Sequence, residues 1–228
     1  MSRFTITIMQ LTAVGRVSAN VGTACILAAG ALAVSATGAQ AAPVALTNHR
    51  ISGIEDAISC LTASRCVAVG YGARGAKNHA DVVALVNGKQ GHISVVAASQ
   101  RLYSVSCPSS AGCWALGPQN SGANLVFVQI GPNGNVTKTT DVSDPFGASI
   151  ARISCVSMKS CAVLTNNIFV TPAAIEIGTW TGTRLTLHKV AGKHGSTATI
   201  GEGISCWKAS CLAAGYYELG AASRPGSC

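Results

Sequence analysis

The residues best suited to chemistry in this 228-residue sequence are its cysteines, because four pairs of them recur with nearly constant spacing. Paired cysteines either bind a metal ion or form a disulfide. Zinc ribbons use pairs two residues apart that converge on one ion, whereas these pairs have five or four residues between their members. The spacing therefore predicts four local disulfides. The expected pairs are Cys60 with Cys66, Cys107 with Cys113, Cys155 with Cys161, and Cys206 with Cys211.

Acidic side chains are the second candidates, because most glycoside hydrolases act with two carboxyl groups. Charged residues do occur in the loops expected before the repeated hairpins, where one rim of the fold could bring them together. We interpret them as solvated loop charges, since their spacing matches no catalytic motif. These residues are Arg101, Asp141, Asp144, Arg152, His194 and Glu202.

Serine and histidine complete the search for a site. A catalytic serine acts once, beside a base and an orienting acid, but here a serine precedes the first cysteine of all four pairs. Four equivalent copies predict a geometric role, such as a hydroxyl bonded to backbone. The five histidines show no spacing typical of metal ligands. We therefore expect no catalytic residue, no metal ligand and no cofactor. The serines are Ser59, Ser106, Ser154 and Ser205.

A glycine-rich stretch at residues 70–75 reads Gly-Tyr-Gly-Ala-Arg-Gly. A dinucleotide site needs such a loop to open a helix. The residues that follow have the pattern of a strand, so we interpret the stretch as part of a hairpin.

These residues must be positioned by a repeated unit, since the first cysteines of the four pairs lie 47, 48 and 51 residues apart. Each pair fits a β-hairpin whose cysteines face each other. This register sets a branched residue against a small one: Ile58 against Ala68, Val105 against Ala115, Ile153 against Val163, and Ile204 against Ala213. It also sets Asp56 against Gly70 and Tyr103 against Gly117. In the third unit Val163 and Thr165 replace the usual Ala and Gly, which predicts looser packing there.

Between the cysteine hairpins, each unit carries two further strand patterns separated by turn residues, for example 82–87 and 92–97. Four antiparallel strands in a unit of 45 to 50 residues are typical of a β-propeller blade. We predict an all-β β-propeller of about four such repeats, the last one incomplete. A β-trefoil or another all-β repeat fold is the alternative.

The expected domain organisation follows from the repeats and from the first 41 residues. Val21 to Ala36 is a run of small apolar residues, and Ala39-Gln40-Ala41 resembles a cleavage site, so residues 1–41 are predicted to be a Sec signal peptide. The rival interpretation is an uncleaved membrane anchor. The repeats then occupy residues 42–217, with an outer strand at 44–47, units near 50–97, 98–141, 142–190 and 191–217, and a flexible tail at 218–228.

The predicted leader places the protein outside the cytoplasm, where regularly spaced cysteine pairs form disulfides. Cys228 has no partner in this scheme. Basic residues outnumber acidic ones by 16 to 8, but they are scattered singly without interleaved aromatic residues, so we expect no nucleic-acid partner.

The phrase Ser-Cys-x5-Cys-x-Ala-x-Gly, followed by paired strands, resembles the repeats of secreted actinobacterial β-propellers, which are grouped with sialidase-like or kelch-like propellers. The resemblance covers Val44 to about Tyr217. It implies the fold but no particular activity.

The expected function is a secreted, non-catalytic binding or interaction module for an extracellular glycan or peptide. The incomplete last repeat suggests self-association, since it leaves an apolar face and a strand edge bare. The alternatives are a sialidase-like glycoside hydrolase or lyase acting through Asp141, Asp144 or Glu202, and a truncated fragment of a longer propeller.

Overall fold

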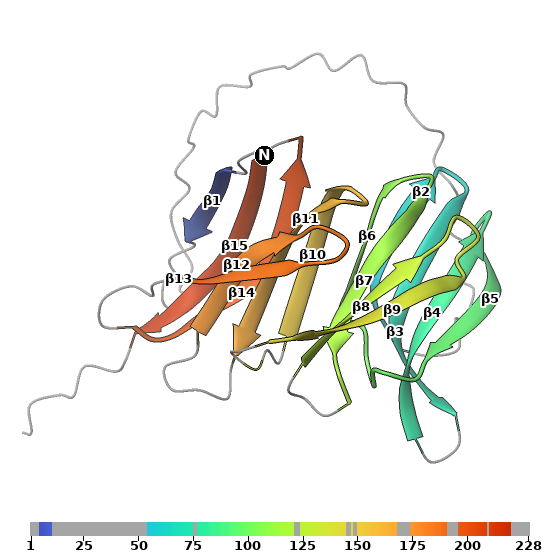
Figure 1. Ribbon diagram of the computed structural model, residues 1–228, viewed down its shortest axis with the longest axis horizontal. Coiled ribbons are helices and arrows are strands. Elements are labelled where there is room, and N and C mark those ends of the chain that lie inside the picture. Colours follow the sequence, from blue (N-terminus) through green and yellow to red (C-terminus); the bar gives the residue numbers. More distant parts are fainter. Residues whose placement is uncertain are drawn as a thin grey trace, which may run out of the picture.

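The computed structural model describes residues 5–10, 54–74, 77–120, 124–144, 147, 150–167, 174–190, 196–208 and 210–219. Within these ranges every regular element is a β-strand, and no helix could cross a membrane. The strands form four sheets in chain order (Figure 1). The fold is therefore all-β, built largely from four-stranded antiparallel sheets, and its strands form no closed barrel.

Three sheets have four strands each, joined in sequence order. The first contains β2 (Ile54–Thr62), β3 (Arg65–Arg74), β4 (Lys77–Val86) and β5 (Lys89–Val96). The second contains β6 (Ser104–Ser109), β7 (Gly112–Pro118), β8 (Asn124–Ile130) and β9 (Val136–Ser143). The third contains β10 (Ile150–Ser157), β11 (Ser160–Asn167), β12 (Ala174–Trp180) and β13 (Leu185–Val190).

The fourth sheet is different, because only its cysteine hairpin follows the repeat. It contains β14 (Ser196–Trp207) and β15 (Ser210–Leu219), with β1 (Thr5–Gln10) beside β15. β1 comes from the segment predicted to be the leader and runs parallel to β15. The third strand of every other sheet is antiparallel to its neighbour, so β1 does not reproduce the third strand of the repeat. The outer strand predicted at 44–47 lies outside the described residues.

The four predicted cysteine pairs are all joined by disulfides, each across its own hairpin, with Cα atoms 3.8 to 4.0 Å apart. The four predicted residue pairs are all confirmed, although in the third hairpin the partner of Ile153 is Val163, a larger residue than the alanine of the other three.

One detail of the predicted register is wrong. Gly70 faces Glu55, because a β-bulge makes Asp56 an extra residue in β2. The second hairpin keeps the predicted register, but its pairing begins with Ser104 opposite Leu116, so Tyr103 lies just before the paired part of β6.

The hydrophobic core lies between successive sheets. Between the first two sheets, Val67, Val69 and Val82 pack with Val105 and Ala115. Trp114, Phe127 and Trp180 fill the space between the second and third, where Phe127 stacks on Trp180 with ring centroids 4.0 Å apart. Between the third and fourth, Leu164 and Ile177 pack with Ala213 and the partly buried Ile204. The strands of the second and third sheets are apolar on both faces because each of these two sheets lies between two others.

The first strands of the sheets are neighbours as well: β2 contacts β6, β6 contacts β10, and β10 contacts β14. The serines that precede the cysteines join them. Ser59 Oγ accepts a hydrogen bond from the N–H of Cys107 at 3.0 Å, Ser106 Oγ from Cys155 at 2.9 Å, and Ser154 Oγ from Cys206 at 2.9 Å. The predicted geometric role is therefore a serine ladder, in which each sheet's serine holds the next sheet's cysteine.

The serine ladder can be tested by substitution. Ser154→Ala leaves the N–H of Cys206 without its acceptor and should lower the free energy of unfolding by about 1–2 kcal/mol. Ser143→Ala, at an exposed position on β9, is the matched control and should change it by less than about 0.5 kcal/mol. Denaturation by guanidinium with the disulfides intact measures both. Equal effects of the two substitutions would contradict the ladder.

Candidate binding site at the polar end of the sheets

The two ends of the inner strands differ in chemistry. The disulfides lie at the end where each cysteine hairpin turns. Polar and charged residues gather at the opposite end, which we call the polar end. It contains Asp56, Tyr71, Arg101, Tyr103, Arg152, Thr165, Asn166 and Glu202.

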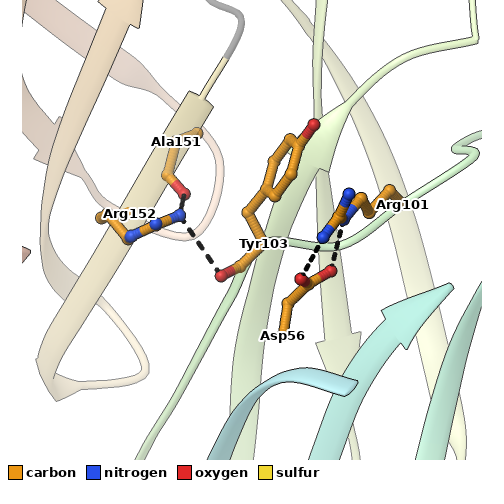
Figure 2. Close-up of polar contacts among 5 residues, drawn as sticks. All are labelled: Asp56, Arg101, Tyr103, Ala151 and Arg152. Atoms are coloured by element: carbon orange, nitrogen blue, oxygen red, sulfur yellow. Dashed lines mark hydrogen bonds and ion pairs between the residues drawn. The ribbon is translucent and has the colours of Figure 1, made fainter. Parts of the chain in front are cut away.

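Arg101 is the centre of this end. Its Nε donates to Asp56 Oδ2 at 2.5 Å and its Nη2 donates to Asp56 Oδ1, so the guanidinium binds the carboxylate with both arms (Figure 2). Asp56 belongs to the first sheet, and Arg101 lies in the segment that enters the second. The bulge in β2 directs the Asp56 side chain toward this contact. The ion pair therefore joins two sheets at the surface, with side-chain exposures of 38% and 15%.

Two tyrosine rings flank the same guanidinium. Its carbon lies 4.7 Å from the ring centroid of Tyr71 and 5.1 Å from that of Tyr103, within the range of cation–π attraction. The hydrogen bonds that Arg101 donates to Asp56 raise the pKa of Arg101 above its ordinary value. The positive charge is therefore permanent, and its plane is held in one orientation.

The backbone around Arg101 is fixed by contacts with both the first and the second sheet. Ser99, which is 1% exposed, donates from its hydroxyl to the carbonyls of Arg101 and Pro118, at 2.8 and 2.6 Å. Leu102 donates its N–H to the carbonyl of Gly70 at 3.1 Å. The chain also passes directly over Gly117, where an added Cβ would lie 2.1 Å from the Arg101 carbonyl oxygen. The glycine of the repeated phrase thus provides the space in which this segment runs.

Arg152 lies beside this cluster on β10. Its Nη1 donates to the carbonyls of Tyr103 and Ala151, at 3.5 and 3.4 Å (Figure 2), and its Nε donates to the carbonyl of Glu202 at 3.4 Å. Arg152 therefore contacts the second, third and fourth sheets. These contacts are long, and among the described residues Arg152 forms no ion pair. Its charge is available to an anionic group.

The other charged residues singled out from the sequence do not assemble into one site. Asp141 is exposed on β9 and accepts a hydrogen bond from Gln119 at 3.2 Å. Asp144 is only 5% exposed, and Glu202 contributes its backbone carbonyl to Arg152. No described contact joins any two of these three acids. His194 lies outside the described residues.

A second polar cluster, which the sequence analysis missed, is buried at the polar end of the third sheet. Glu176 is 1% exposed and accepts a hydrogen bond from the Thr165 hydroxyl at 2.8 Å. Burial raises the pKa of Glu176 against the lowering effect of that hydrogen bond, and the negative charge of Asp144 raises it further. Asn166 donates to the carbonyl of Gly201 and accepts from its N–H. The two hydrogen bonds of Asn166 join the third sheet to the fourth.

The expectation of looser packing in the third unit is wrong. Val163 and Thr165 are both fully buried. Val163 faces Gly178 across the sheet, whereas in the other sheets Ala68 faces Val83 and Ala115 faces Val128. In the third sheet the larger residue of this pair is therefore on the second strand and the smaller one on the third, the reverse of the other sheets. Thr165 donates a hydrogen bond to the Glu176 carboxylate.

Comparison of the sequence with protein-family models and with curated proteins finds no match. The site must therefore be interpreted from its own geometry.

The close approach at Gly117 is testable. Gly117→Ala forces the backbone of Arg101 away from β7 and should lower the free energy of unfolding by about 2 kcal/mol or more. Gly203→Ala is the matched control, because an added Cβ there meets nothing within 4 Å. Thermal unfolding followed by circular dichroism measures both. A Gly117→Ala protein as stable as the control would show that the segment does not depend on this contact.

The buried carboxyl predicts a pH dependence. A carboxyl group whose pKa is raised by folding binds its proton more tightly in the native state, so its ionisation costs stability as the pH rises above the ordinary value of about 4.3. Glu176→Gln should therefore be more stable than the original protein at pH 7.5, and the difference should shrink toward pH 4. Glu202→Gln, at an exposed position, should show little change. Urea denaturation across this pH range provides the measurement, and a difference independent of pH would refute the assignment.

Proposed function

We propose that this chain is a secreted, non-catalytic binding module of β-propeller type, whose ligand is a glycan carrying a carboxylate. The observation that carries the proposal is the site at the polar end, where Arg101 lies against the rings of Tyr71 and Tyr103. Beside it is Arg152, whose hydrogen bonds to other described residues all go to backbone carbonyls.

Several features support a propeller. Its blades are four-stranded antiparallel sheets that pack face to face around an axis. Here the sheets follow one another in chain order (Figure 1), and their first strands are neighbours. The four disulfides indicate an oxidising environment, which agrees with secretion.

The chemistry of the site favours an acidic sugar. Arginine binds a carboxylate through two parallel N–H groups, and Arg152 has such groups beside the carbonyl of Tyr103. The partly exposed rings of Tyr71 and Tyr103 offer apolar surface to a sugar. Peptide ligands, in contrast, are commonly bound along a sheet edge or in an apolar groove, and neither forms this site.

Hydrolysis is the less supported function. Among the described carboxyl groups, Glu176 has its pKa raised in part by the charge of another acid, Asp144, and both residues are buried, at 1% and 5% exposure. A substrate does not reach them in this structure.

The test is a binding screen of the oxidised protein against acidic and neutral glycans, with acidic peptides as the rival class. We expect binding to an acidic glycan that weakens with salt. Arg152→Ala should weaken that binding tenfold or more, since a charged hydrogen bond contributes about 1.5–3 kcal/mol. Arg184→Ala, at an exposed position outside the site, should leave it unchanged. Binding confined to peptides, or equal effects of the two substitutions, would overturn the proposal.

A further inference from the structure

Every contact between successive sheets uses the same two surfaces. We call the face that bears the branched and small pair, such as Val105 and Ala115, the back face of a sheet. The front face bears the ladder serine and the residue after the second cysteine. In each of the three interfaces, the front face of one sheet packs on the back face of the next. The interface is thus heterologous and repeated.

Among the described residues, no sheet precedes the back face of the first sheet. Ile58 is 60% exposed there, whereas its equivalents Val105 and Ile153 are 8% and 4% exposed. On the same face Val95 is 45% exposed, while Ala68 and Val83 are buried in a cluster with Leu85 of their own sheet. The outer residues of one half of the repeated interface are therefore exposed at this end of the molecule.

No sheet formed by the described residues follows the front face of the fourth sheet. Leu212 is 41% exposed, whereas its equivalents Val67 and Trp114 are 0% and 2% exposed. Trp207, which follows the first cysteine of this hairpin, is 76% exposed. This is the other half of the same interface, and it lies at the opposite end of the row of sheets (Figure 1).

The serine ladder is open at the same two places. Ser205 is exposed, and among the described residues its hydroxyl has no hydrogen-bond partner. Cys60 faces Cys66 across its hairpin as the other first cysteines face theirs. Closely spaced opposed residues in an antiparallel pair do not hydrogen-bond to each other, so the N–H of Cys60 points away from β3. Within the described ranges, Ser205 Oγ therefore has no donor and the N–H of Cys60 has no serine acceptor.

We propose that a second copy of this chain occupies both faces. The front face of each copy's fourth sheet packs on the back face of the other copy's first sheet, and Ser205 Oγ accepts the N–H of Cys60 across each junction. Heterologous contacts form a ring when their rotation closes. Two copies supply eight sheets, within the range of four to eight blades typical of propellers. A second copy fits because it carries the same pair of faces that already pack three times within one chain.

The self-association is independent of the ligand, so its test can fail without affecting the glycan screen. Native mass spectrometry and light scattering of the oxidised full chain should show a dimer. Ile58→Asp and Leu212→Asp each place a charge in one half of the interface, and each should yield a monomer. Thr139→Asp, at an exposed position on β9, is the matched control and should remain a dimer. Circular dichroism establishes that the variants are folded.

Mixing the two monomeric variants is the decisive experiment. A mixed pair has one junction with both aspartates and one junction with neither, so the mixture should recover a dimer that neither variant forms alone. A monomeric original protein would overturn the proposal. Assemblies larger than two copies, or a mixture that stays monomeric, would also overturn it. A dimer that only one of the two substitutions disrupts would overturn it as well, because that result indicates an isologous contact between two identical faces.

Discussion

The fold depends on a hydrogen bond from the backbone of one sheet to a serine of the sheet before it. Apolar faces attract each other without a preferred direction, so burial alone would let neighbouring sheets slide. The bond from Cys107 to Ser59, repeated at Cys155 and Cys206, gives each interface a fixed offset. The disulfide provides the donor, because the cysteine it joins turns its N–H away from its own hairpin.

This arrangement separates stability from recognition along the strands. Short disulfide loops tie one end of each hairpin, with an expected contribution of about 2–2.5 kcal/mol each in the chain-entropy model. The polar end of each hairpin has no disulfide, and the connecting segments there carry the polar groups. There the bulge at Asp56 aims a carboxylate at Arg101, and a second bulge lies at Glu202. Segments on a rigid scaffold can vary without loss of the core.

The third sheet shows how such a repeat tolerates change. Its strand β11 has Val163 and Thr165 where the other hairpins place smaller residues, yet both are fully buried. The added volume of Val163 is offset by Gly178 on the neighbouring strand. The hydroxyl of Thr165 is satisfied by Glu176, so the side chain adds a contact where looser packing was expected.

The sequence by itself determined the elements: the strands, the hairpin register around each cysteine pair, the four disulfides and the geometric role of the serines. These are local features, set by alternation of side chains and by spacing along a few residues. Only the tertiary structure decided which distant residues meet. Asp56 and Arg101 are 45 residues apart. Their contact depends on the bulge in β2, which no residue type in the sequence predicts. Glu176 is buried in the assembled fold, whereas Ile58 remains exposed because no described sheet covers it. The hairpins follow from residues close together in the chain, whereas the burial of a side chain depends on how distant sheets pack.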